Sequence, residues 1–80
     1  MAYHSKNGQE FVGLRSQMNG GRQIVYDNQP GPRVVFAIKD PKANLQDIDD
    51  ALREGVRARN VLSGVLTALK NRDISFEYPI

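Results

Sequence analysis

The sequence predicts a small α+β domain: an antiparallel meander of three to four strands, then one long or two consecutive helices packed on one sheet face, then a C-terminal strand. Two observations support this fold class. Short β-branched and aromatic runs, separated by Gly, Asn and Pro, occupy residues 1–40. From residue 44 the apolar residues follow a helical period, and the last residues alternate again. Because 80 residues can enclose only one core, we predict that residues 1–80 form a single domain.

The first strands are delimited by glycine turns. Asn7 and Gly8 stand between "AYHS" and "EFVGLRS". This dipeptide tolerates the positive φ that a type I′ turn requires at both central positions, so it predicts a hairpin. A second turn signal, "NGG" at 19–21, precedes the run "QIVYD". The pattern therefore predicts three antiparallel strands before residue 28.

The segment from Arg33 to Lys39 is the most apolar run of this half. Pro30 and Pro32 stop the preceding strand, because proline cannot donate a ladder hydrogen bond, and Gly31 permits a tight bend. Five consecutive apolar residues then follow without alternation. A strand of this kind is typically buried on both faces. We therefore expect it to be the central strand of the sheet.

A helix is predicted to begin after Asn44. Asn44 is a favourable N-cap, and Asp47 follows within the first turn, where carboxylates interact well with the helix dipole. Asn71 is expected to take a left-handed conformation at the far end. Apolar residues recur at helical spacing throughout this segment, at Leu45, Ile48, Ala51, Leu52, Val56, Val61, Leu62, Val65, Leu66, Ala68 and Leu69.

The helical segment contains a change of buried face at "REGVRARNVL", residues 53–62. At 100° per residue, the apolar arcs before and after this stretch differ in direction by about 90°, so one straight helix cannot bury both against one sheet. Either the chain breaks near Arg59 and Asn60, with Asn60 capping a second helix, or one helix of about 42 Å contacts different partners at its ends and implies a dimer. A domain of this size is only about 25 Å across, which favours the break.

The last segment, "ISFEYPI", has the alternation of a half-buried strand. Ile74, Phe76 and Tyr78 fall on one side, and Ser75 and Glu77 fall on the other. We expect this strand to return to the meander and pair with it.

Composition argues against several kinds of chemistry. The chain has no cysteine, and its one histidine is His4, so nothing in it suggests a nucleophile and base. The cluster "DIDD", residues 47–50, is explained by its place in a first helical turn and needs no metal. No apolar run approaches the ~20 residues that cross a bilayer. We therefore expect a cytoplasmic protein that is not an enzyme and that binds no cofactor, metal or membrane.

Charge points weakly to an anionic partner. The formal net charge is +2, and residues 1–40 carry all of this excess. An isoelectric point near 9.2 is compatible with nucleic-acid binding, although +2 over a whole domain is a small charge. Because arginine presents a planar fork to phosphates and carboxylates alike, the arginines are the candidate partner-binding residues: Arg15, Arg22, Arg33, Arg53, Arg57 and Arg59.

The function expected from these features is a small non-enzymatic binding module that acts through protein–protein contact. It would serve as a regulator or inhibitor, as many small phage and mobile-element proteins do, and it could form a homodimer. The contact surface would be the open sheet face, an edge strand or the arginine-bearing helix. The alternative is a nucleic-acid-binding domain that uses arginines on the sheet and helix, with tyrosines on the open face as stacking platforms.

Overall fold

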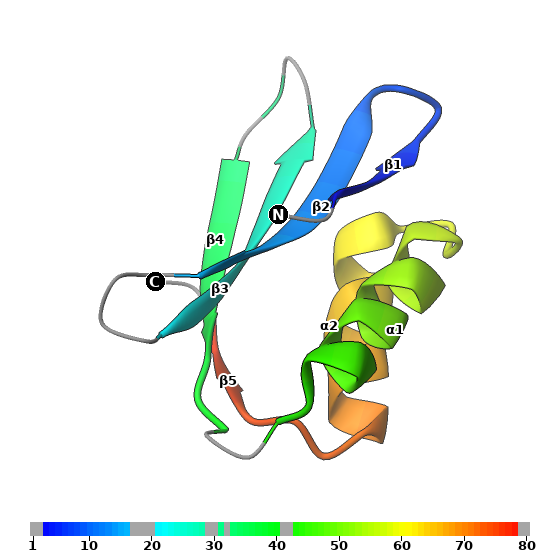
Figure 1. The fold of residues 1–80 in the computed structure, drawn as a ribbon. Helices are drawn as coiled ribbons and strands as arrows, with labels where there is room; N and C mark the ends of the chain where they lie inside the picture. The colour runs from blue at the N-terminus through cyan, green and yellow to red at the C-terminus, as the bar shows by residue number, and fades with distance from the viewer. Residues whose placement is uncertain (1–2, 17–20, 29–30, 32, 41–42, 79–80) are drawn as a thin grey trace.

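The computed structural model describes residues 3–16, 21–28, 31, 33–40 and 43–78. It confirms the α+β architecture of meander, helices and returning strand. Two helices cover one face of a five-stranded antiparallel sheet with strand order β1-β2-β3-β4-β5 (Figure 1). The elements along the chain are β1 (Tyr3–Lys6), β2 (Glu10–Ser16), β3 (Arg22–Asn28), β4 (Arg33–Ile38), α1 (Leu45–Val56), α2 (Val61–Asn71) and β5 (Phe76–Glu77).

The centre of the sheet is β3, and the expectation that β4 would be central was wrong. β4 lies between β3 and the two-residue strand β5, and within it only Phe36 is fully buried. β3 instead has buried residues on both faces, with Ile24 toward the helices and Val25 away from them. The uninterrupted apolar run of β4 reflects packing by Phe36 on one side and partly covered valine and alanine on the other.

The predicted hairpin between β1 and β2 is present. Asn7 and Gly8 have φ of 55° and 68°, as a type I′ turn requires, and the Gln9 N–H donates to the Lys6 carbonyl at 3.1 Å. Most of the predicted "NGG" turn and most of the Pro30–Pro32 turn lie outside the described residues. The register Val12↔Tyr26 and Tyr26↔Val34 continues the meander across β2, β3 and β4.

The helical segment consists of two helices, as the change of buried face predicted. Asn44 caps α1 by accepting the Gln46 N–H at 2.7 Å, and Asn60 caps α2 by accepting the Ser63 N–H at 3.1 Å. The single long helix is therefore excluded, together with the argument for a dimer that rested on it. The expectation for Asn71 was wrong: Asn71 is the last residue of α2, and Asp73 takes the left-handed conformation, with φ of 54°.

The two helices approach each other most closely at two glycines. A methyl group at Gly55 would lie 2.7 Å from the backbone nitrogen of Val65, and one at Gly64 would lie 2.9 Å from the Gly55 carbonyl oxygen. Neither space can hold a side chain, so glycine is required at both positions for this contact. The close approach lets α1 and α2 form one layer and bury their apolar faces together.

The hydrophobic core lies between this helical layer and the covered face of the sheet. Val12, Ile24 and Phe36 from the sheet are all fully buried there against both helices. The rings of Phe76 and Tyr78 each lie 5.7 Å from the Phe36 ring, centroid to centroid. This packing explains why the C-terminal strand returns to β4, and it confirms the alternation predicted for that segment.

Polar side chains attach the edge strand β1 to the helical layer. Lys6 Nζ donates to the carbonyl oxygens of Ala58 and Arg59, at 2.7 and 3.3 Å, where the two helices meet. His4 Nε2 lies 2.9 Å from Asp49 Oδ1 on α1. Even-numbered residues of β1 therefore face the helices, and odd-numbered residues face the other side of the sheet.

Among the described residues, neither helix has the length and apolar character needed to cross a membrane.

Candidate functional site

The face of the sheet opposite the helices, here called the open face, carries the candidate site. No described element packs on it (Figure 1). Strand pairing places its residues in rows across the sheet. One row is Tyr3, Gly13, Val25 and Val35, and the next is Ser5, Phe11, Asp27 and Arg33. Aromatic, apolar and charged side chains thus alternate over four strands.

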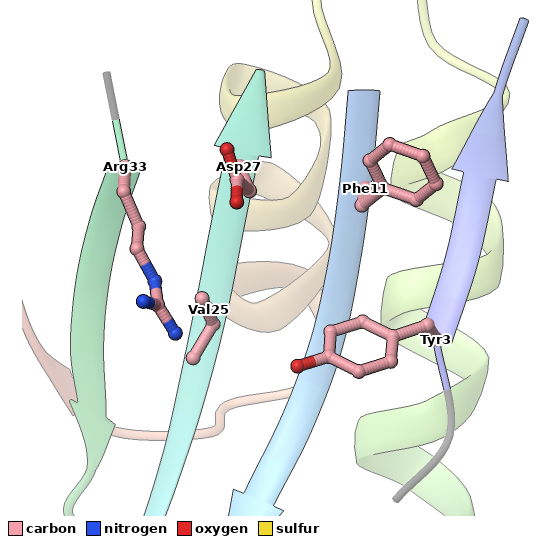
Figure 2. A pocket seen from close by; sticks show the side chains of 5 residues that line it. All are labelled: Tyr3, Phe11, Val25, Asp27 and Arg33. Carbon is pink, nitrogen blue, oxygen red and sulfur yellow. The ribbon is translucent and has the colours of Figure 1, made fainter. Parts of the chain in front are cut away.

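A pocket of about 380 Å³ lies across these two rows. It is open to solvent and shallow. Figure 2 shows it from the open side, with the helices behind the sheet, and with one lining side chain from each of β1, β2 and β4 and two from β3. The lining residues are Tyr3, Phe11, Val25, Asp27 and Arg33. It extends from the edge strand β1 across β2 and β3 to β4, near one end of the sheet.

Tyr3 is the most prominent aromatic residue of the pocket. It faces Gly13 in register, and because Gly13 has no side chain, the tyrosine ring can lie over β2 (Figure 2). Tyr3 is 52% exposed, whereas Val25 beyond it is only 2% exposed. A large aromatic surface is therefore exposed to solvent beside Val25, and Tyr3 is not part of the hydrophobic core.

Two opposite charges in the pocket stand side by side without neutralising each other. Asp27 and Arg33 are direct cross-strand neighbours. Nevertheless, within the described part of the chain no ion pair or hydrogen bond joins either side chain to another residue. The Arg33 guanidinium extends along the sheet toward Val25 and away from the Asp27 carboxylate (Figure 2). Both groups keep their hydrogen-bonding capacity for a ligand.

Arg15 also lies on the open face, two rows from Arg33. Its Nε and Nη2 both donate to Gln23 Oε1, and Gln23 is 9% exposed. This pair covers the end of the face near β4 and β5, where Lys39 and Glu77 form an exposed ion pair at 3.5 Å. Arg15 is thus held in place by Gln23.

The structure does not bring the six candidate arginines together. Arg15 and Arg33 share the open face. Arg22 points to the other side and donates to the Ala43 carbonyl oxygen at 2.7 Å, which fixes the segment before α1. Arg53 pairs along α1 with Asp49 at 2.9 Å and with Asp50 at 3.9 Å. The arginines therefore do not form one continuous basic surface.

Arg57 and Arg59 remain from the arginine-rich stretch. Both are exposed at the connection between α1 and α2, and no described residue pairs with either side chain. Glu54, which precedes them, pairs instead with Arg72 at 2.8 Å. The stretch is thus a helix junction with two free cations at its surface.

The shifted ionisable groups lie on the covered side of the sheet, and each has a structural explanation. Burial raises the pKa of Tyr26 to about 12, aided by the 2.6 Å hydrogen bond from its hydroxyl to Glu10 and by the negative charge of Glu10. The hydrogen bond from His4 and the nearby Arg53 lower the pKa of the Asp49 carboxyl. The first contact joins β3 to β2, and the second joins β1 to α1. None of these side chains lines the pocket.

In the part of the chain that the structure describes, no three or more His, Cys, Asp and Glu side chains gather in a way that could hold a metal ion. His4 contacts Asp49, which itself pairs with Arg53. The "DIDD" cluster thus serves α1: Asp49 and Asp50 bond to neighbouring side chains, and Ile48 enters the core.

Sequence reasoning identified Arg33 as a candidate and considered Tyr3 as an exposed aromatic residue, but it missed the contributions of Phe11, Val25 and Asp27. The missing signal was register. Only the pairing of Tyr3 with Gly13, and of Asp27 with Arg33, places these residues in one pocket. The glycine in an otherwise apolar strand, Gly13, was the local feature that could have indicated a ring lying across it.

Comparison with known protein families, with curated proteins and with solved structures finds no match to this chain. Its function therefore has to be inferred from the geometry of its own residues.

Proposed function

We propose that the protein is a non-enzymatic binding module that acts through protein–protein contact, with the open face of the sheet as its contact surface. The observation that carries the proposal is the pocket of Tyr3, Phe11, Val25, Asp27 and Arg33. It combines an exposed aromatic ring, an apolar floor and free charges on a face that no described element covers. Tyrosine and arginine are the residue types that contribute most to protein interfaces.

The distribution of apolar residues supports this proposal. The core already contains the apolar side chains of the covered face, so Tyr3 and Phe11 are not needed to close it. Exposed aromatic residues beside polar ones are typical of interface centres, where a partner covers them and excludes water. A rigid sheet also loses little conformational entropy on binding, which favours affinity.

A module of this kind acts by occupying its partner. We propose a regulatory or inhibitory role in a reducing compartment such as the cytoplasm, consistent with a chain that has no cysteine. A small phage or mobile-element protein that blocks a larger host protein would fit such a role. A homodimer would be a further possible use of the same face.

Nucleic-acid binding is the alternative, and one observation favours it. Arg57 and Arg59 are exposed and free of partners among the described residues, close to Lys6 at the helix junction. Phosphate contacts at this junction would make affinity fall steeply with salt concentration. The junction and the open face are different surfaces, so mutation can separate the two functions.

The proposed function can be tested by panning a display library of random peptides against the intact, immobilised chain. We expect the enriched peptides to lose at least tenfold in affinity for Tyr3→Ala and for Phe11→Ala. The matched control is Leu45→Ala, because Leu45 is 51% exposed, like Tyr3, but lies on α1. Its affinity for the same peptides should change less than twofold.

Two outcomes would contradict the proposal. Peptides that bind Tyr3→Ala as tightly as the natural chain would exclude the open face. Binding of labelled single-stranded DNA or RNA that depends steeply on salt, and that is lost in an Arg57→Ala, Arg59→Ala double variant, would support the nucleic-acid alternative instead.

A further inference from the structure

We infer that the pocket on the open face recognises an acidic side chain, Asp or Glu, of a protein partner, with Arg33 and the Tyr3 hydroxyl as its hydrogen-bond donors. This inference rests on the proposed function and names the chemistry of the partner. It follows from the direction of the two donors, from the surface between them and from the position of Asp27.

The two donors lie on the same face of the sheet and approach the same space from different strands. Arg33 comes from β4, and its guanidinium lies over the row of Val25 (Figure 2). Tyr3 comes from β1, and its ring crosses β2 so that the hydroxyl points toward that row as well (Figure 2). No hydrogen bond connects either side chain to another described residue. Both are free to donate to a ligand that enters between them.

The surface below the donors is apolar. Val25 is 2% exposed and lies between Arg33 and Tyr3, and the Phe11 ring lines the pocket on the side toward β1 (Figure 2). When a ligand covers such a surface and displaces water, a charge-assisted hydrogen bond becomes stronger. A carboxylate on a short aliphatic stem fits this arrangement, because its oxygens accept from the donors while its methylene groups contact the exposed Tyr3 ring. Arginine also binds a carboxylate through two parallel N–H groups.

The position of Asp27 favours a single carboxylate over a phosphate backbone as the ligand. Its carboxylate lines the same pocket and has no cationic partner among the described residues. It would repel a run of phosphates, because some of them must lie close to it, whereas a single carboxylate bound at the Arg33 guanidinium lies on the side away from it (Figure 2). A peptide instead presents one acidic side chain together with backbone N–H groups or a basic neighbour that Asp27 can accept from. Charge complementarity therefore favours a peptide segment over a nucleic acid.

The test compares two display libraries of random peptides panned against the intact chain: one allows all residues, and the other replaces Asp and Glu by Asn and Gln. We expect binders that depend on Arg33 from the first library only. Their synthetic peptides should lose at least tenfold in affinity for Arg33→Gln, and the same amount when one particular Asp or Glu of the peptide is replaced by its amide. Tyr3→Phe, which removes only the hydroxyl, should lose several-fold.

Exchanging the charges of Arg33 and of the peptide acid distinguishes a direct contact between them from a general loss of peptide affinity. Arg33→Glu should lose the acidic peptide and regain affinity for the peptide in which that acid is replaced by Lys. The matched control is Arg57→Gln, an exposed arginine of the helical layer, which should change affinity less than twofold.

Three outcomes would overturn the inference. Open-face binders that need Tyr3 and Phe11 but no acid would disprove it while leaving the proposed function intact. Binding of a 12-nucleotide oligothymidine that is lost in Arg33→Gln would mean that the pocket binds a nucleic acid. Self-association in sedimentation equilibrium that is lost in Arg33→Gln would make it a second copy of this chain.

Discussion

The two faces of the sheet use similar residues for different purposes. On the covered face, Val12, Ile24 and Phe36 are fully buried between strands and helices. On the open face, Tyr3 is half exposed, although it belongs to the same set of aromatic strand residues. Exposed aromatic residues beside unpaired charges contribute little to the core. The covered face therefore stabilises the fold, and the open face is available for contact with a partner.

The largest expected effect is on the covered face. Phe36→Ala removes a fully buried ring that contacts Phe76 and Tyr78, and it should reduce the free energy of unfolding by about 3–5 kcal/mol. Tyr3→Ala on the open face should cost no more than about 1 kcal/mol, because half of that side chain is already in water. Urea denaturation followed by circular dichroism compares the two.

If Phe36→Ala does not fold, Phe36→Leu keeps the comparison measurable with a smaller cavity. Equal losses for Tyr3→Ala and Phe36→Leu would mean that the open face contributes as much to stability as the covered face.

The contact between the helices should be the next most sensitive feature. Gly55→Ala places a methyl group against Val65 Cγ2 and 2.7 Å from the Val65 backbone, so one helix must move. We expect a loss of about 2–3 kcal/mol in the free energy of unfolding, in spite of the better helix propensity of alanine. Thr67→Ala, at an exposed position of α2, is the control and should change stability by less than about 0.5 kcal/mol. A stable Gly55→Ala would contradict the close approach of the helices.

Alkaline pH should weaken the covered face through Tyr26. Because the folded pKa of about 12 lies above the ordinary tyrosine value of 10.0, the stabilisation is complete below pH 10 and is lost between pH 10 and pH 12. A loss of about 2 kcal/mol over this range follows from the size of the shift. Tyr26→Phe removes the titrating group, so its stability should fall less over the same range. Parallel curves for the two proteins would exclude Tyr26 as the cause.

The smallest expected effect is the acid dependence of the contact between β1 and α1. The pKa of Asp49 is lowered in the folded chain, so its stabilisation is present above the unfolded pKa and is lost as pH falls through the folded pKa. His4→Ala removes the first cause of this shift. Because both side chains are partly exposed, the variant should cost at most about 1 kcal/mol at neutral pH. NMR titration of the Asp49 carboxyl checks the direction, and an unchanged titration in His4→Ala would contradict it.

The fold could be predicted largely from local patterns. Asn44 and Asn60 cap helices where the sequence indicated, and the change of buried face near Arg59 correctly predicted two helices. These features depend on a few residues that are neighbours in the sequence, so a single sequence is enough to predict them. The central strand was predicted wrongly because strand order depends on pairing between distant segments: the short strand β5 contributes little cover to β4, whereas β3 has neighbours along its full length.

The candidate site was harder to predict for the same reason. Charge alone selected six arginines, and the structure shows that Arg22 and Arg53 are held by local contacts that fix the fold. The pocket depends on cross-strand register, which places Arg33 beside Asp27 and Tyr3 over Gly13. Residue type identified two of the five lining residues, and only the pairing of the strands could supply the other three.

The most direct experiment is an NMR titration of the natural chain with the tightest-binding peptide selected by display. We expect the backbone amide signals of Phe11, Val25 and Asp27 to shift together, whereas those of α1 and α2 stay close to their free positions. Shifts confined to the two helices, or centred on Arg57 and Arg59, would mean that the open face of the sheet is not the contact surface.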